Sequence, residues 1–144
     1  MALFTQDTKV KALKRAPLFE GLSKKELTQL ARVTEDIELR KGQVLCKEGE
    51  IGHEFFVIVD GKAEVTRKGK KITQRGGGEF IGEIALVEEV PRTATVTAKT
   101  PMRAFVLTST DFHHLLEQSP QVQNKVLRAL ARRVAELSED PAVA

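Results

Sequence analysis

The sequence predicts a mostly β fold with helices at both ends, and three observations lead to this expectation. Short apolar segments with strand-like alternation recur at intervals of about 8 to 12 residues between positions 36 and 108. The segments before and after them repeat apolar residues at helical spacing instead. The chain has 144 residues, which is the size of one domain. We therefore expect N-terminal helices, a compact antiparallel β body and C-terminal helices in a single domain, residues 1–144.

Residues 1–35 carry the signals of N-terminal helices. Ser23 and Glu26 have the spacing of a capping box, in which each side chain accepts a hydrogen bond from the backbone at the start of a helix. Leucines at helical spacing follow this pair. A shorter helix is expected around Val10 and should end before Pro17, because the residue before a proline disfavours the helical conformation.

Residues 36–108 contain the expected strands, which lie around positions 37–40, 44–47, 55–59, 63–65, 94–98 and 103–107. The Phe55–Val59 run is apolar throughout, which predicts a strand buried on both faces. The dipeptide Asp60-Gly61 directly follows and favours a hairpin to the strand that contains Ala63 and Val65. The basic segment from Arg67 to Lys71 is expected to form a second, solvated hairpin tip.

Residues 109–139 return to a helical pattern. Ser109 or Thr110 is expected to cap a short helix, and Ser119-Pro120 places a cap before a proline at the first position of a longer one. An apolar stripe is predicted along the longer helix, formed by Val122, Val126, Leu130, Val134 and Leu137. The basic residues of this helix lie largely off the stripe and are Lys125, Arg128, Arg132 and Arg133.

Composition narrows the classes of function. The 23 Lys and Arg residues exceed the 20 Asp and Glu residues by too little to argue for nucleic acid binding. The single cysteine, Cys46, excludes a disulfide framework and suits a reducing compartment. The Phe55–Val59 run is the longest apolar run, far shorter than the roughly 20 residues of a membrane span. We expect a cytoplasmic protein without membrane insertion.

One segment departs from the alternation of its surroundings. The glycines at 76–78 lead into a short apolar run that contains Gly82 and Glu83, and Arg92 follows soon after. Backbone N–H groups at the start of a short helix, together with an arginine, favour an anion such as phosphate. A carboxylate between them suits the hydroxyl groups of a sugar. The glycine spacing fits neither a dinucleotide fingerprint nor a triphosphate-binding loop. Phosphate and ribose together imply a nucleotide, and a single arginine with a few amides suits an anion of low charge.

The two halves of this segment, Phe80–Leu86 and Pro91–Val96, resemble the phosphate-binding cassette of the cyclic-nucleotide-binding domain family. That family includes catabolite activator proteins, regulatory subunits of cyclic-nucleotide-dependent kinases and cyclic-nucleotide-gated channels. The resemblance implies an antiparallel, jelly-roll-like β-roll over residues 36–108, with the cassette at 80–96. It also implies that the final helix, around residues 126–137, forms a lid over the bound base.

The resemblance assigns ligand-binding roles to Gly82, Glu83, Ile84, Ala85, Arg92 and Thr93. Arg92 is expected to bind the cyclic phosphate and Glu83 the ribose 2′-hydroxyl group. The backbone amides of Ile84 and Ala85 would complete the phosphate site, and Gly82 would give access near the sugar. Thr93 resembles the threonine of cGMP-binding members, but channels with a comparable threonine respond to cAMP, so the ligand is either cAMP or cGMP.

We therefore expect a cyclic-nucleotide sensor that signals through its C-terminal helix to an effector protein or a homo-oligomer. No catalytic group, cofactor or metal site is indicated, because His113 and His114 face different directions on a helix and Cys46 suits a core position. Two alternatives stay open. Glu83 and Arg92 could form an ion pair in a ligand-free interaction or dimerisation domain. The chain could also be a catabolite-activator-type DNA regulator, although it ends without a helix-turn-helix.

Overall fold

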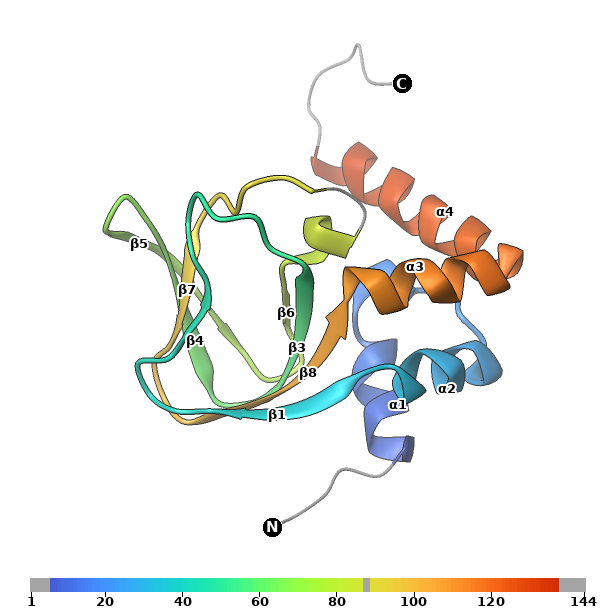
Figure 1. Ribbon diagram of the computed structural model, residues 1–144, viewed down its shortest axis with the longest axis horizontal. Helices are drawn as coiled ribbons and strands as arrows, with labels where there is room; N and C mark the ends of the chain where they lie inside the picture. The colour runs from blue at the N-terminus through green and yellow to red at the C-terminus, as the bar shows by residue number, and fades with distance from the viewer. Residues whose placement is uncertain (1–5, 87–88, 138–144) are drawn as a thin grey trace.

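The structure is a computed structural model that describes residues 6–86 and 89–137, and its strands form two antiparallel sheets. The first sheet has the order β1 (Glu35–Leu39), β8 (Met102–Thr108), β3 (Glu54–Asp60) and β6 (Phe80–Ile81). The second has the order β2 (Val44–Cys46), β7 (Thr95–Ala98), β4 (Lys62–Arg67) and β5 (Lys70–Gly76). Figure 1 shows that the sheets form a roll and that the helices gather at one end of it. The predicted β-roll with flanking helices is confirmed.

The turn at Asp60-Gly61 connects the two sheets, so the hairpin expected there is wrong. β3 pairs with β8 and β6, whereas β4 pairs with β5 and β7. Gly61 has a φ of +90°, and a Cβ atom there would lie 2.5 Å from the carbonyl oxygen of Pro101. The turn therefore packs against the connection between β7 and β8. A turn signal depends on neighbouring residues only, whereas strand pairing also depends on strands that are distant in the sequence.

β3 is buried on both faces, as the sequence predicts, because it lies between two hydrophobic clusters. Phe55 and Val57 pack in the cluster that the strands share with the helices. Phe56 and Ile58 belong to the cluster between the two sheets. β8 alternates between the same two clusters. These two central strands therefore connect the helical end of the molecule to the interior of the roll.

The N-terminal helices are α1 (Gln6–Lys14), the short 3-10 helix η1 (Pro17–Phe19) and α2 (Lys24–Arg32). The capping box is confirmed, because the Ser23 hydroxyl accepts a hydrogen bond from the Glu26 amide at 3.1 Å. In return, the Glu26 carboxylate accepts one from the Ser23 amide at 2.8 Å.

α3 (Ser109–Gln118) follows directly after β8. Its N-cap is Thr108, one residue before the earlier of the two expected caps. The Thr108 hydroxyl accepts a hydrogen bond from the Asp111 amide at 3.2 Å. The last residue of the strand therefore also begins the helix, which leaves no loop between β8 and α3.

α4 (Pro120–Leu137) begins at the expected Ser119-Pro120 and packs on η1 and α3. Val122 and Val126 are buried, whereas Val134 is 56% exposed. The predicted apolar stripe is thus covered in the first half of the helix and not at Val134. The side chains of Leu137 and Arg133 lie outside the described part of the structure.

α4 is also tied to α2 by a partly buried ion pair. The Lys125 ammonium lies 2.6 Å from the Glu26 carboxylate, and the Glu26 side chain is only 8% exposed. Burial alone would raise the pKa of Glu26. The hydrogen bonds from Lys125 and from the Ser23 backbone and hydroxyl outweigh this effect, so the pKa of Glu26 lies below its ordinary value. Lys125 therefore has a structural role that its position off the apolar stripe does not suggest.

Candidate functional site

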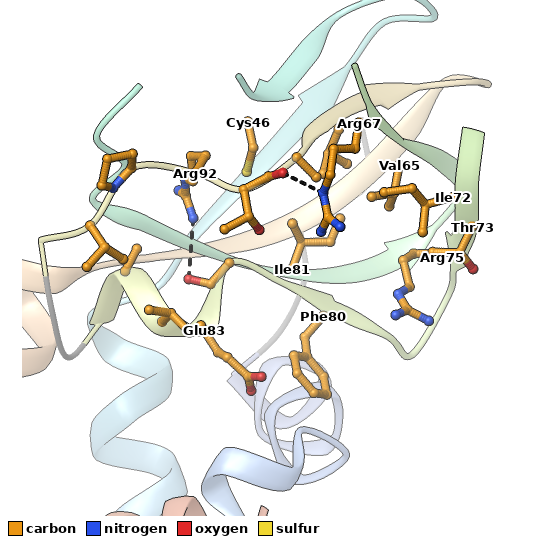
Figure 2. A pocket seen from close by; sticks show the side chains of 18 residues that line it. Cys46, Val65, Arg67, Ile72, Thr73, Arg75, Phe80, Ile81, Glu83 and Arg92 are labelled. Atoms are coloured by element: carbon orange, nitrogen blue, oxygen red, sulfur yellow. Dashed lines mark hydrogen bonds between the residues drawn. The ribbon is translucent and has the colours of Figure 1, made fainter. Parts of the chain in front are cut away.

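A cavity of about 350 Å³ lies inside the roll, between the second sheet and the segment that joins β6 to the 3-10 helix η2 (Glu83–Leu86). Figure 2 shows its lining. The six residues predicted to bind ligand all line this one cavity: Gly82, Glu83, Ile84, Ala85, Arg92 and Thr93. The structure thus brings together two segments that are separated in the sequence, and the short helix expected after Gly82 is present.

The Arg92 guanidinium is held in the cavity by two backbone carbonyl groups. Its Nη2 donates to the oxygen of Glu54 at 2.7 Å, and its Nη1 donates to the oxygen of Gly82 at 3.4 Å. The Arg92 backbone is fixed as well, because its amide donates to the Glu50 oxygen at 2.8 Å and its oxygen accepts from the Gly49 amide at 2.9 Å. Arg92 is therefore positioned before any ligand arrives.

Two glycines make room for this guanidinium. A Cβ atom at Gly52 would overlap the Arg92 side chain, and one at Gly82 would contact Arg92 Nη1 and lie 2.9 Å from the Glu54 oxygen. Gly82 also has a φ of +82°, which other residues rarely adopt. Sequence reasoning found Gly82 but missed Gly52, which lies 40 positions before Arg92 in the chain.

Glu83 lines the cavity at the start of η2 and is partly buried. In Figure 2 its carboxylate points away from the Arg92 guanidinium and lies on the side of Phe80. The two groups therefore occupy different parts of the cavity wall. A ligand that contacts both must reach from the one to the other, as a phosphate joined to a sugar does.

One of the two backbone amides expected to bind the phosphate, that of Ala85, already donates a hydrogen bond within the protein. The Ala85 amide donates to the Gly82 oxygen at 3.1 Å, which is the hydrogen bond that closes the first turn of η2. This oxygen also accepts the bond from Arg92. Ala85 is buried, whereas the Ile84 side chain is 58% exposed at the edge of the cavity. An anion at this turn would have to compete with the Gly82 oxygen for the Ala85 amide.

The opposite wall comes from β4 and β5, and sequence reasoning assigned no ligand role to it. Its lining residues are Val65, Arg67, Ile72, Thr73 and Arg75. The solvated hairpin tip expected from Arg67 to Lys71 is confirmed, because β4 and β5 pair up to Arg67 and Lys70 and the tip is exposed. Arg67 also lines the cavity, which the sequence did not indicate, and its Nε donates to the Thr93 oxygen at 3.0 Å. The alternation of the strand could have predicted this position. Arg67 follows Val65 by two residues, so both side chains lie on the same face of β4.

Cys46 also lines the cavity, although the expectation that it is a core residue is confirmed. It is 5% exposed and packs in the cluster between the sheets. Burial raises the pKa of the Cys46 thiol, while the positive charge of Arg92 acts in the opposite direction. The thiol is therefore uncharged at neutral pH and contributes an apolar part of the wall.

The expected lid helix does not cover the cavity in this structure. Among the α4 residues whose side chains are described, none lines the cavity, and the helix packs on η1 and α3 instead. Figure 1 shows α4 on the helical side of the molecule, with η2 between it and the roll. Within residues 6–86 and 89–137, no helix is long and apolar enough to cross a membrane. In the same part of the chain, no cluster of three or more His, Cys, Asp or Glu could hold a metal ion.

Comparisons with known proteins agree on one family. Residues 36–119, more than half of the chain, match the cyclic nucleotide-binding domain. A cyclic nucleotide-gated potassium channel of Rhizobium etli is 35% identical over 118 residues, which cover 81% of this chain and 33% of the channel. A cAMP-dependent protein kinase regulatory subunit of Eremothecium gossypii is 36% identical over 105 residues, or 72% of this chain and 23% of that protein.

This chain thus spans a third or less of the length of these two curated relatives. Among solved structures, the N-terminal domain of a transcriptional regulator from Streptomyces coelicolor superposes with a TM-score of 0.83 at 32% identity. The match covers 89% of this chain and 95% of that one, so it includes the flanking helices as well as the roll. The chain belongs to the cyclic nucleotide-binding domain family.

Proposed function

We propose that this chain binds cAMP or cGMP in the cavity of the roll and acts as a sensing module without catalytic activity. The observation that supports this most is the Arg92 guanidinium, which two carbonyl groups hold inside a cavity of about 350 Å³. A guanidinium is permanently charged and matches two phosphate oxygens at once. The volume lies near the lower end for small-molecule sites, which suits one mononucleotide.

In this proposal Arg92 binds the cyclic phosphate and Glu83 accepts a hydrogen bond from the ribose 2′-hydroxyl group. Their separation on the cavity wall suits a phosphate and sugar that are fused in one ligand. The Ile84 amide adds a donor to the phosphate, and the Ala85 amide joins it only if the bond to the Gly82 oxygen opens. Thr93 lies at the base end of the site.

The ligand signal would leave the cavity through α4. This helix packs on η1 and α3 rather than over the cavity, so a bound nucleotide can favour a second position in which α4 covers it. A ligand shifts such an equilibrium only by the difference in its affinity for the two positions. The relatives named above include a channel, a kinase regulatory subunit and a transcriptional regulator, so we leave the effector as a protein partner or a second copy of the chain.

Calorimetric titration with cAMP and with cGMP tests the proposal on the wild-type chain and on Arg92→Ala. Loss of one partner in a desolvated charge pair costs about 2–5 kcal/mol. We therefore expect the variant to bind at least about 30-fold more weakly. Arg40→Ala is the matched control, because Arg40 is exposed and lies outside the cavity lining, and its affinity should equal that of the wild type.

Two results would contradict the proposal. Unchanged affinity of Arg92→Ala would remove the assigned phosphate contact. No heat and no thermal shift with either cyclic nucleotide would favour the ligand-free interaction domain instead. Measuring the size of the protein with and without nucleotide by light scattering, in the same samples, tests whether occupancy changes the oligomeric state.

A further inference from the structure

Arg67 brings a second guanidinium into the cavity that holds Arg92. It is the last residue of β4, and with Val65 it lines the wall opposite η2. In Figure 2 its guanidinium points into the cavity beside the segment that follows Arg92. Its Nε donates to the Thr93 oxygen at 3.0 Å, which leaves four N–H donors on the two Nη atoms.

The position of Arg67 is fixed by a network that also fixes Arg92. The Glu48 carboxylate accepts a hydrogen bond at 3.0 Å from the amide of Lys68, the residue after Arg67. The Glu48 amide donates to the Thr95 hydroxyl at 3.0 Å. One residue later, the Gly49 amide donates to the Arg92 oxygen at 2.9 Å. The backbone at the end of β4 and the cassette are therefore held to the same loop, and the bond to the Thr93 oxygen ties the Arg67 side chain to the cassette.

Charged side chains from both walls line the cavity. Arg75 lies 3.3 Å from Glu79, so its charge is balanced by a neighbouring carboxylate. Among the residues that the structure describes, Arg67, Arg92 and Glu83 are the other charged residues that line the cavity. A ligand with a single negative charge would balance the formal charges of these three side chains. Arg67 is thus part of the charge balance for a monoanion, although Arg92 alone is assigned to the phosphate.

Arginine distinguishes purines by their hydrogen-bonding edges. A guanidinium only donates, and guanine presents two neighbouring acceptors, O6 and N7, which one arginine can contact together. Adenine has N7 but carries a donor amino group in place of O6. Arg67 adjoins Thr93, which the proposed function places at the base end of the site, and its guanidinium lies apart from that of Arg92 on the wall opposite η2.

We propose that Arg67 contacts the base and gives the cavity a preference for cyclic nucleotides of 6-oxopurines, guanine or hypoxanthine, over adenine. This inference rests on the proposed function, because it needs a cyclic nucleotide whose phosphate is bound by Arg92. It assigns a specificity role to a residue outside the cassette.

Calorimetric titration of the full chain with cGMP, cIMP and cAMP is the first test. We expect cGMP and cIMP to bind about tenfold or more tightly than cAMP. cIMP keeps O6 and N7 but lacks the 2-amino group of guanine. If cIMP binds as weakly as cAMP, the discrimination belongs to a contact with the 2-amino group, such as one from Thr93, and the inference is overturned.

Arg67→Met is the second test, with Lys70→Met as its matched control. Lys70 is the cross-strand partner of Arg67, is exposed and lies outside the cavity lining, and each change removes one positive charge. We expect Arg67→Met to reduce the preference for cGMP over cAMP to about threefold or less, and Lys70→Met to leave it unchanged. Arg67→Lys keeps the charge without the planar fork and should also lose the preference.

The outcomes separate this inference from the proposed function. Binding of cyclic nucleotides without a preference for the 6-oxopurines, or a preference that Arg67→Met retains, overturns the inference alone. Absence of binding by all three nucleotides overturns the proposed function and the inference with it. Thermal unfolding of each variant, measured before titration, shows that a lost preference reflects the site and not a loss of folded protein.

Discussion

At the scale of single residues, the position of the Arg92 side chain depends on a glycine distant in the sequence. We predict that Gly52→Ala weakens cyclic-nucleotide binding by about tenfold or more. The added methyl group overlaps the Arg92 guanidinium, so the arginine must leave the place where the Glu54 and Gly82 oxygens hold it. Calorimetric titration of the variant measures the loss.

Gly76→Ala is the matched control for this change. A Cβ atom at Gly76 would meet its nearest neighbour, the Gly61 oxygen, at an ordinary contact distance of 3.8 Å. Neither Gly52 nor Gly76 has a positive φ, so the two substitutions differ in the space available and not in backbone strain. Wild-type affinity of Gly52→Ala would mean that Arg92 binds the ligand from another position.

Glu26 carries a prediction about pH. Its pKa is lowered in the folded protein, so its carboxylate stabilises the fold above the ordinary value of 4.5, and this contribution is lost as the pH falls further. We predict that Glu26→Gln lowers the free energy of unfolding by about 1–3 kcal/mol at pH 7, because Lys125 loses its partner. Urea unfolding followed by circular dichroism should show that the gap to wild type narrows below about pH 4.5.

Glu20→Gln supplies the control for the Glu26 prediction. The Glu20 carboxylate lies 3.5 Å from the guanidinium of Arg132, which belongs to α4 as Lys125 does. The Glu20 side chain is 63% exposed and the Arg132 side chain 55%. A solvated pair of this kind is worth about 0.5 kcal/mol or less. Equal effects of the two substitutions at pH 7 would show that the Glu26–Lys125 pair is no stronger than a surface pair.

At the scale of secondary-structure elements, local signals predicted where helices and strands lie better than they predicted strand pairing. The Ser23–Glu26 capping box and Ser119-Pro120 locate two helix starts because caps involve neighbouring residues only. Asp60-Gly61 correctly marks a turn, but β3 pairs with β8, which lies more than 40 residues further along the chain, and its two faces are buried by different clusters.

The same distinction applies to the site. The cassette residues, including Gly82 and Arg92, come from two nearby segments whose spacing is itself a signal, and the structure brings them into one cavity. Gly52 is needed only because a side chain from 40 residues further along occupies its space, which no local pattern reports. The place of Arg67 in the cavity wall was predictable in part, because strand alternation puts it on the same face as Val65. Its basic neighbours indicated only an exposed hairpin tip.

For α4 we predict that adjacent substitutions have unequal effects on stability. Val126 is 3% exposed and Leu127 is 65% exposed. Val126→Ala should lower the free energy of unfolding by about 1–3 kcal/mol, since it leaves a cavity where α4 packs on the N-terminal helices. Leu127→Ala should change it by about 0.5 kcal/mol or less. Chemical unfolding measures the free energy of unfolding of both variants. Similar decreases in the two variants would contradict the packing of α4 through Val122 and Val126.

At the scale of the whole molecule, the helices and the roll share their core through β3 and β8. Alternate residues of these strands pack against the helices on one side and against the second sheet on the other, as Phe55 and Phe56 do. Neither cluster can lose its packing without exposing a face of the same strands. We therefore expect one cooperative unfolding transition, in which helical and strand signals are lost together.

This coupling gives a prediction that joins the site to the helices. A ligand at about 100 times its dissociation constant stabilises the folded state by about 2.7 kcal/mol. For a chain of this size that raises the melting temperature by roughly 5–10 °C. Because the unfolding is cooperative, cyclic nucleotide bound in the roll should stabilise both parts of the molecule by the same free energy. The helical circular dichroism signal at 222 nm and the amide exchange of β3 and β8 measure the two parts separately.

Arg92→Ala at the same nucleotide concentration should abolish most of both shifts. A nucleotide that protects the strands but leaves the helical transition in place would show that the two clusters unfold independently, and that occupancy of the cavity does not reach α4 through the core.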